Sequence, residues 1–180
     1  ESIRRGLSKP IGSLTQMATI RLGKRTDNRS PRIRDLVPLA RLDDIVFGAW
    51  DPIPDDAFTA ATKAGVLEEK HLEPLRDFLS AIQPMPAVFD QNYVARIHGT
   101  NVKTGATKRD LAEQLRQDIR DFKARHGCDR MVAVWCGSTE VFIALSDVHQ
   151  SIAAFERGMA EGHADIAPSM LYAWACIMEG

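Results

Sequence analysis

The stretch Met131-Val132-Ala133-Val134-Trp135-Cys136-Gly137-Ser138-Thr139-Glu140 decides the fold. It opens with five apolar residues that no polar residue interrupts, and it continues with small and hydroxyl-bearing residues. Such an unbroken apolar run is typical of a strand that is covered on both faces. The segment before it, residues 107–126, has the pattern of a helix, and a helix followed by a short buried strand is typical of a parallel α/β sheet. Ligands bind beyond the carboxyl ends of such strands, so we expect residues 136–140 to border a binding crevice.

The composition of the chain is that of a globular protein with one sizeable core. The 180 residues are 44% hydrophobic and 26% charged, and the net charge of −1 provides no overall attraction to nucleic acid or to an anionic membrane. The three cysteines lie far apart, which excludes a disulfide framework and a zinc ribbon and predicts a reducing compartment. No apolar run reaches the roughly 18 residues of a membrane span. Because the first residues are charged we expect no signal peptide, and with no initiator methionine we expect an internal piece of a longer polypeptide.

A run of basic residues follows the weak strand pattern of residues 14–22. One interpretation is a grip on phosphate or nucleic acid, because basic side chains bind phosphate oxygens. Asp27 interrupts the run and no aromatic residue interleaves it, which favours the alternative of a solvated loop. The basic residues are Arg21, Lys24, Arg25, Arg29, Arg32 and Arg34.

Residues 44–52 form the second clear strand pattern, in which apolar residues flank Gly48 and Pro52 ends the run. Gly48 allows another backbone or a flat ligand to approach closely. Asp51 lies at the carboxyl end of this strand and leaves two interpretations open. As a functional residue, it accepts a hydrogen bond from a sugar hydroxyl or orders the neighbouring loop. As a structural residue, it caps the helix that opens at Pro54.

Hydrophobic periodicity predicts helices in much of the remaining chain. The clearest begins at Thr107, where Asp110 completes a capping box, and it ends at Gly127. The last helix is apolar almost all round, which is typical of a helix that is buried in a larger assembly. The other predicted elements are a helix over 54–64, a helix with Pro74 in its first turn, a brief strand over 87–89, a turn over 101–106, a helix that starts at Ser146 and the last helix over 167–178.

The sequence contains no self-contained catalytic motif, such as a nucleophile elbow, a zinc-protease helix, a P-loop or a GxGxxG turn. Cys136 is the nearest candidate, either as a nucleophile helped by a histidine or as a small residue at the edge of a crevice. A lone histidine in a loop, such as His98, is more often a surface residue than a ligand or base. The backbone amides of Gly137 and Ser138, with the hydroxyls of Ser138 and Thr139, suit the ribose or phosphate of a nucleotide.

Several strings, in the same order and spacing, resemble the myo-inositol-1-phosphate synthase (inositol-3-phosphate synthase) family in its bacterial or archaeal form. The resemblance covers nearly the whole chain and implies an α/β fold, a Rossmann-like NAD(P)-binding domain with three αβα layers around a parallel sheet. Residues 1–180 are then one incomplete fragment of that domain, with a glycine-rich loop expected before Glu1 and the α+β catalytic domain with its lysines after Gly180. The strings are Ser13-Leu14-Thr15-Gln16, Val46-Phe47-Gly48-Ala49-Trp50-Asp51, the helix from Asp110 to Lys123, Val134-Trp135-Cys136-Gly137-Ser138-Thr139-Glu140, and Ala167-Pro168-Ser169 with the apolar helix after it.

The activity that this resemblance implies is the conversion of D-glucose 6-phosphate to 1L-myo-inositol 1-phosphate by an isomerase that acts as an intramolecular lyase. Bound NAD oxidises the sugar, an aldol-type ring closure follows, and the NADH formed reduces the product. The 180-residue piece alone is expected to be inactive. The resemblance also implies a role in inositol and phospholipid biosynthesis and a cytoplasmic homotetramer, with no nucleic-acid or membrane partner.

Carried over position by position, the resemblance implies cofactor-binding residues but no catalytic or metal-binding residue in this chain. Asp51 matches the family's acidic cofactor residue. His98 and Asn101 stand where eukaryotic members have Gln and Arg, and residues 136–139 replace a Thr-Ala-Asn-Thr string with residues of similar size or hydrogen-bonding capacity. The expected NAD-binding residues are Asp51, Ala87, Val88, His98, Asn101, Cys136, Gly137, Ser138 and Thr139.

Three alternatives remain open at this point. The chain belongs to an NAD-dependent homologue that acts on another phosphorylated sugar, or it is a non-catalytic binding module that uses the basic loop and the last helix, or it is a thiol enzyme that uses Cys136.

Overall fold

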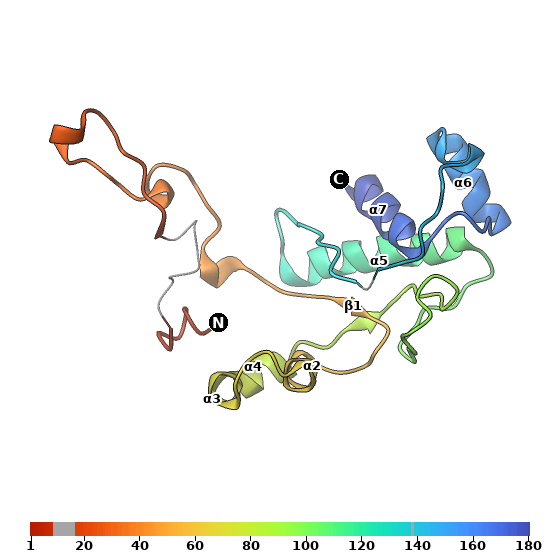
Figure 1. Cartoon of the computed structure of the whole chain (residues 1–180), viewed down its shortest axis with the longest axis horizontal. Coiled ribbons are helices and arrows are strands. Elements are labelled where there is room, and N and C mark those ends of the chain that lie inside the picture. Colours follow the sequence, from red (N-terminus) through yellow and green to blue (C-terminus); the bar gives the residue numbers. More distant parts are fainter. Residues whose placement is uncertain (9–16, 138) are drawn as a thin grey trace.

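The computed structural model describes residues 1–8, 17–137 and 139–180, and a small parallel sheet lies at its centre between two groups of helices (Figure 1). Strand β1 (Trp50–Asp51) pairs in parallel with β2 (Met85–Pro86), with Trp50 opposite Met85. The N–H of Met85 also donates to the carbonyl oxygen of Ala49 (2.8 Å). Helices lie on both sides of a parallel sheet, which confirms the α/β fold class.

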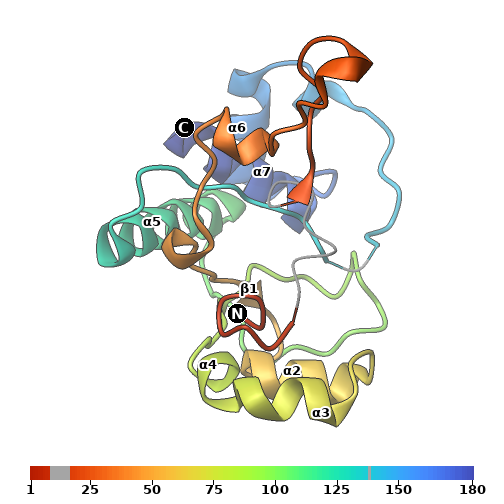
Figure 2. The same cartoon turned by 90° about the vertical axis from the view of Figure 1, so that its left-hand side faces the viewer.

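The helices form one group on each side of the sheet, and Figure 2 shows the same separation from the side. One group comes from the chain between β1 and β2, and the other from the chain after β2. The first group contains α2 (Ala57–Ala64), α3 (Glu69–Leu72) and α4 (Arg76–Ser80). The second contains α5 (Lys108–His126), α6 (Ile152–Glu161) and α7 (Pro168–Glu179). Short 3-10 turns cover Arg25–Asp27, Ile33–Asp35, Leu42–Asp44, Glu73–Leu75 and Asp147–His149.

Helix α5 begins and ends where the sequence predicts. The Thr107 hydroxyl accepts a hydrogen bond from the Asp110 N–H (3.1 Å), and the Asp110 carboxylate accepts one from the Thr107 N–H (3.0 Å). At the other end, Gly127 takes the left-handed conformation (φ 61°) that glycine adopts most readily. Both signals act within a single turn, so the sequence was enough to place this helix.

The hydrophobic core lies where α5, α6 and α7 meet, and Val88 joins it from the end of β2. Each large apolar side chain buried here contributes about 1.5–3 kcal/mol to stability. This core therefore contributes much of the burial energy of the described chain. Its buried members are Val88, Ala112, Leu115, Ile119, Met159, Ile166, Leu171, Trp174 and Ala175.

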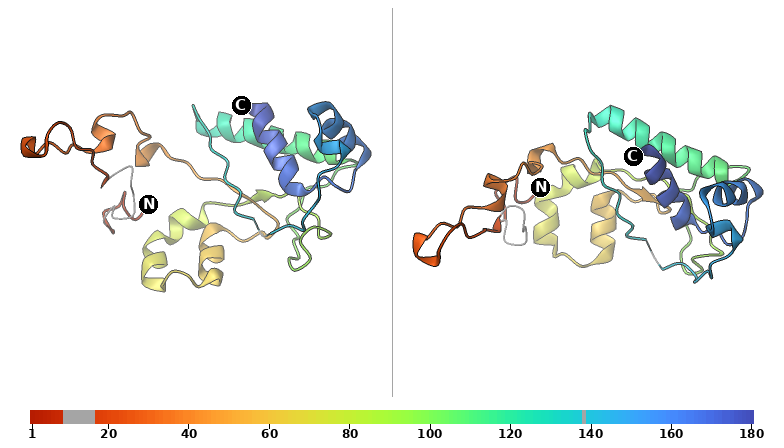
Figure 3. Two further views of the ribbon diagram at one scale, coloured as in Figure 1. Left: turned by 45° about the horizontal axis from the view of Figure 1, so that its top comes forward. Right: turned by 90° about the horizontal axis from the view of Figure 1, so that it is seen from above.

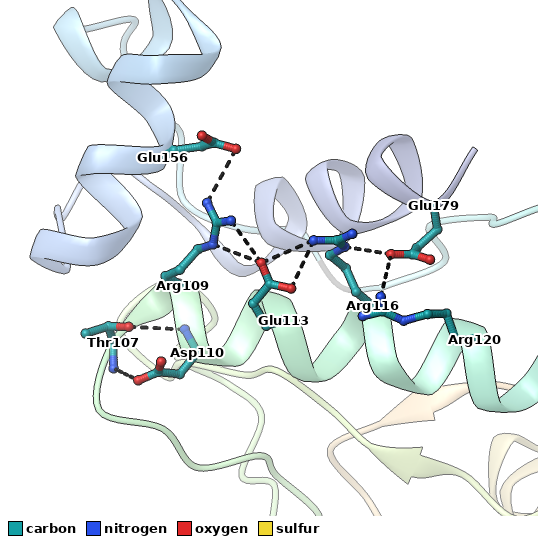
Figure 4. Close-up of polar contacts among 8 residues, drawn as sticks. All are labelled: Thr107, Arg109, Asp110, Glu113, Arg116, Arg120, Glu156 and Glu179. Carbon is teal, nitrogen blue, oxygen red and sulfur yellow. Dashed lines mark hydrogen bonds and ion pairs between the residues drawn. The ribbon is translucent and has the colours of Figure 1, made fainter.

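Ion pairs cover the edge of this core along α5 and α7 (Figure 4). The guanidinium groups of Arg109 and Arg116 lie over the ring of Trp174, at 4.6 and 5.5 Å from its centroid. Arg116 binds Glu179 at the end of α7 (Nε to Oε1, 2.6 Å), and Arg109 reaches Glu156 of α6 (3.4 Å). The arginines thus join all three helices across a buried aromatic ring.

The prediction of a doubly covered strand at Met131–Trp135 is wrong for this structure. The segment forms no strand, and Val132 and Val134 are 88% and 73% exposed. A strand requires a neighbour that shares its backbone hydrogen bonds, and no other segment in the described part of the chain provides one. Trp135 packs against α7 through the ring of Tyr172.

The strand expected over residues 44–52 is also shorter than predicted, since only Trp50 and Asp51 form β1. The apolar residues before them are exposed, and this part of the chain leads into an arm that projects away from the helices (Figure 3). Gly48 does permit a close approach, but of a side chain: a Cβ at this position would lie 2.5 Å from the ring of Phe122.

The basic run lies on this arm. Residues 18–22 pair in antiparallel fashion with residues 29–33 through a bridge between Thr19 and Arg32, while residues 14–16 of the expected strand lie outside the described residues. All the basic side chains of the run are exposed, as the interpretation of a solvated loop expects.

Three further boundaries differ from the predictions. Pro74 lies in a 3-10 turn between two short helices, since proline cannot donate the hydrogen bond that a continuous helix needs. The helix expected from Ser146 begins at Ile152 instead, because the Ser146 N–H donates to the His149 ring (3.0 Å) and closes a separate 3-10 turn. The strand predicted over 87–89 is found over 85–86 instead. Ala87, the next residue, forms a single parallel bridge with Val102, which lies in the turn predicted over 101–106.

We predict that Thr107→Ala lowers the free energy of unfolding by about 1 kcal/mol, because it removes the acceptor for the Asp110 N–H. Urea unfolding measures this loss. Thr107→Ser keeps the hydroxyl and is the matched control, for which we expect most of the stability to be retained. Equal losses in the two variants would contradict the assigned cap.

Candidate functional site

The candidate site lies at the carboxyl ends of β1 and β2, where Asp51 is half-buried. Its Oδ1 accepts a hydrogen bond from the N–H of Ile53 (2.8 Å), so Asp51 orders the loop that follows the strand. It does not cap α2, as one interpretation proposed, because Asp56 occupies that position and accepts from the N–H of Thr59 (2.8 Å). No described residue donates to Oδ2 of Asp51, so this carboxylate oxygen can accept a hydrogen bond from a ligand hydroxyl.

Asn101 is brought directly to Asp51. Its side-chain amide donates to the carbonyl oxygens of Asp51 (2.9 Å) and Met85 (3.3 Å) and so ties the ends of the two strands together. Its backbone N–H donates to the carbonyl oxygen of Pro52 (2.9 Å). Asn101 therefore braces the loop beside Asp51, and its amide donors are engaged within the protein.

His98 lies on the surface of the same loop, with Nδ1 3.0 Å from Nε2 of Gln91. The loop packs closely on the end of β1, since a Cβ on Gly99 would lie 2.4 Å from Cβ of Pro52. The structure thus places the loop at the site, with Asn101 facing inward and His98 exposed.

Ala87 and Val88 are 3% and 5% exposed. The Ala87 N–H donates to the carbonyl of Asn101 (2.9 Å), and the Val88 N–H donates to the hydroxyl of Tyr172 (2.8 Å). Both backbone donors are therefore already used. These two residues form the floor on which the neighbouring segments rest.

Tyr172 of α7 is the central contact of the site, and sequence reasoning missed it. Its ring packs edge-on against Trp50 and at a tilt against Trp135, with centroids 5.4 Å apart in both pairs. Together with its bond to Val88, it joins β1, the end of β2 and the 131–135 segment. The available signal was a phenol in an otherwise apolar helix, because a buried tyrosine hydroxyl needs a partner.

Burial raises the pKa of the Tyr172 phenol well above its ordinary value of 10. The carboxylates of Asp118, Asp51 and Glu140 add to this effect, because a second negative charge near them is unfavourable. The phenol thus keeps its proton well above physiological pH: its oxygen accepts from the Val88 N–H, and its O–H donates to the Val88 carbonyl oxygen (3.4 Å).

The segment 136–140 passes this aromatic cluster and ends on α7. Cys136, Gly137 and Thr139 are exposed, whereas Ser138 lies outside the described residues. A Cβ on Gly137 would lie 2.7 Å from the ring of Trp135, so this position has no room for a side chain in the present conformation. Among the described residues, Cys136 has no histidine within hydrogen-bonding distance, and the nucleophile interpretation gains no support.

The site contains no metal-binding cluster: no three His, Cys, Asp or Glu residues converge anywhere in residues 1–8, 17–137 and 139–180. No helix of the described chain is both long and apolar enough to cross a membrane. Two pockets, of about 420 and 350 Å³, lie on the N-terminal arm and beside α2, α3 and α4, and neither is lined by an expected cofactor residue.

The chemistry of the remaining groups fits a dinucleotide. The unoccupied Oδ2 of Asp51 is the acceptor that a ribose hydroxyl requires at the end of a strand. The exposed backbone at Cys136 and Gly137 leaves N–H groups free for a phosphate or ribose, since no described residue accepts from them.

The comparisons with known proteins all point to the same family. The profile of an NAD-binding domain described as myo-inositol-1-phosphate synthase matches residues 1–180. An inositol-3-phosphate synthase of Bacteroides thetaiotaomicron is 52% identical over 177 residues, which cover 98% of this chain and 41% of that protein. An inositol-3-phosphate synthase of Oryza sativa subsp. japonica is 35% identical over 179 residues, covering 94% of this chain and 34% of that protein.

The crystal structure of inositol-3-phosphate synthase from Caenorhabditis elegans matches the fold with a TM-score of 0.84 and 27% identity. The match covers 94% of this chain and 34% of that one. The Rossmann-like fold that the sequence predicts is thereby confirmed. The chain spans less than half the length of each of these relatives.

We predict that Tyr172→Phe lowers the free energy of unfolding at neutral pH by about 1–2 kcal/mol, because the buried N–H of Val88 loses its acceptor. Urea unfolding at pH 7 measures the loss. A variant as stable as the parent would show that the hydroxyl contributes nothing to joining α7 and β2.

The same variant tests the raised pKa of Tyr172. In the unfolded chain the phenol ionises near pH 10, whereas the folded protein holds its proton to higher pH. The stabilisation is therefore complete below about pH 10 and is lost as the pH rises towards the folded-state pKa. We expect the parent protein to lose stability more steeply than Tyr172→Phe as the pH rises above about 10. Parallel curves would contradict this assignment.

Proposed function

This chain belongs to the myo-inositol-1-phosphate synthase family, and we propose that it is part of the NAD-binding domain of an inositol-3-phosphate synthase. The full-length protein converts D-glucose 6-phosphate to 1L-myo-inositol 1-phosphate. The observation that carries this proposal is the match of the whole chain to the NAD-binding domain of that family, with Asp51 at the carboxyl end of β1 as the acidic residue of the site. Bound NAD supplies a hydride acceptor for oxidation of the sugar and returns the hydride at the end of the cycle.

The residues of this chain bind and orient the cofactor. Oδ2 of Asp51 accepts a hydrogen bond from a ribose hydroxyl, while Oδ1 keeps the carboxylate in place through the N–H of Ile53. Asn101 holds the ends of both strands at a fixed separation, and Ala87 and Val88 form the floor beneath the adenosine end. His98 borders the site from the loop surface. Cys136 and Gly137 offer backbone amides to the cofactor, and Thr139 offers its hydroxyl.

The catalytic residues that we expect for the sugar chemistry lie outside these 180 residues. The support for this division is that the chain spans 41% of the Bacteroides relative and 34% of the rice relative. From membership in the family we further propose that the full-length enzyme is a homotetramer, that it is cytoplasmic and that it supplies inositol for phospholipid synthesis.

We predict that Asp51→Ala in the full-length protein raises the dissociation constant for NAD about tenfold, the effect of losing one charge-assisted hydrogen bond. Titration calorimetry measures it. Asp51→Asn keeps an acceptor oxygen and should lose less affinity. Asp55→Ala is the matched control, because Asp55 lies in the same loop but pairs with Lys63 of α2. Unchanged NAD affinity in Asp51→Ala would remove Asp51 from the site.

We also predict that the isolated 180-residue chain forms no inositol phosphate from glucose 6-phosphate, whereas the full-length protein does. An enzymatic assay of both, with circular dichroism to compare their helix content, checks this. Product formation by the isolated chain would contradict the proposed division between cofactor and catalytic parts.

A further inference from the structure

Helix α7 is capped from a distance. Its N-cap residue, Ala167, has no side chain that can accept a hydrogen bond, and Pro168 follows as the first helical residue. The carboxylate of Glu140 takes this role from 29 residues earlier in the chain: Oε1 accepts from the N–H of Ser169 (3.0 Å), and Oε2 accepts from the Ser169 hydroxyl. A negative charge at a helix N-terminus also interacts favourably with the helix dipole.

The same helical turn holds the other end of the candidate cofactor segment. Trp135, immediately before Cys136, packs on Tyr172, which lies three residues after Ser169 and so on the same face of α7. Glu140, immediately after Thr139, is bound to Ser169. Cys136, Gly137 and Thr139 therefore lie between two residues that are both anchored on α7.

Few other contacts restrain this segment. No hydrogen bond joins residues 131–137 or Thr139 to another part of the described chain. Cys136, Gly137 and Thr139 are all exposed. These described residues are therefore restrained mainly through the two anchors, and Glu140 is the anchor on their carboxyl side.

We propose that Glu140 is a positioning residue for the cofactor: by binding the N-terminus of α7, it holds the neighbouring residues Cys136, Gly137 and Thr139 in the conformation that receives NAD. This inference rests on the proposed function, since it assumes that these residues contact the dinucleotide. Glu140 itself touches α7, so it acts through the segment that it holds.

A helix cap with no further role would give a different result from a positioning residue. Loss of a cap lowers the stability of the protein, but it leaves the affinity of the folded state for NAD unchanged. Loss of a positioning residue weakens binding, because NAD must then order a segment that was previously held.

The test uses the full-length protein and compares Glu140→Ala with Ser151→Ala. Ser151 caps α6 by accepting from the N–H of Ala154 (3.1 Å), so Ser151→Ala removes a comparable cap on another helix. Titration calorimetry gives the dissociation constant for NAD. Urea unfolding gives the stability, and hydrogen exchange of a peptide covering 131–140 reports the order of the segment.

We expect Glu140→Ala to raise the dissociation constant for NAD about tenfold and to speed hydrogen exchange in the 131–140 peptide. Ser151→Ala should lower stability and change neither quantity. Ser169→Ala removes one of the two donors to Glu140 and should raise the dissociation constant for NAD by a smaller factor. In a protein that already carries Glu140→Ala, adding Ser169→Ala should cause no further change, because the two groups act as a pair. Glu140→Gln keeps an acceptor for the Ser169 N–H and should bind NAD more tightly than Glu140→Ala. If Glu140→Ala does not fold, Glu140→Gln and Ser169→Ala are compared with the parent protein in its place.

The outcomes separate this inference from the function on which it rests. A parent protein that binds no NAD overturns the proposed function, and the role of Glu140 with it. A parent protein that binds NAD, with Glu140→Ala less stable but equal in NAD affinity, overturns only the positioning role and leaves Glu140 as a helix cap.

Discussion

The hydrogen bond from the N–H of Val88 to the hydroxyl of Tyr172 connects the sheet to the helical core, and the site depends on it. The two residues are 84 positions apart in the chain. The bond fixes the depth at which α7 lies against the end of β2, and the ring of Tyr172 then fits between Trp50 and Trp135. One side chain thus sets the relative positions of three segments that border the candidate site.

A second set of contacts holds β1 on α5. The indole N–H of Trp50 donates to Asp118 (2.7 Å), and the same carboxylate oxygen pairs with Lys103 (2.8 Å). The side chains of Lys103 and Asp118 are only 9% and 21% exposed, so both charges lose much of their hydration. The attraction between them offsets that cost. Because Lys103 follows Asn101, this ion pair also holds the loop that braces Asp51.

The polar contacts of Lys108 have a similar effect at the far end of the core. Its Nζ donates to the hydroxyl of Tyr93 (2.8 Å) and to the carbonyls of His163 (2.7 Å) and Ile166 (2.6 Å). All three ammonium donors are used, which compensates for the partial burial of the charge. The turn between α6 and α7 is thereby tied to the first residue of α5, and α7 receives the fixed starting point that Glu140 and Tyr172 require.

The sequence by itself determined the elements whose signals are local. The capping box and closing glycine placed α5, the Ala167-Pro168 start placed α7, and the family strings located Asp51 and residues 136–139 at the ends of strand patterns. Only the tertiary structure decided the partners of these residues: Asn101 with the carbonyl of Asp51, 50 positions away, and Glu140 with Ser169, 29 positions away. It also decided that Met131–Trp135 forms no strand here, since strand formation depends on a neighbouring backbone and not on the apolar run alone. Helical periodicity and caps act within one or two turns and can be found in the sequence, whereas strand pairing and long-range hydrogen bonds depend on which distant segments the fold brings together.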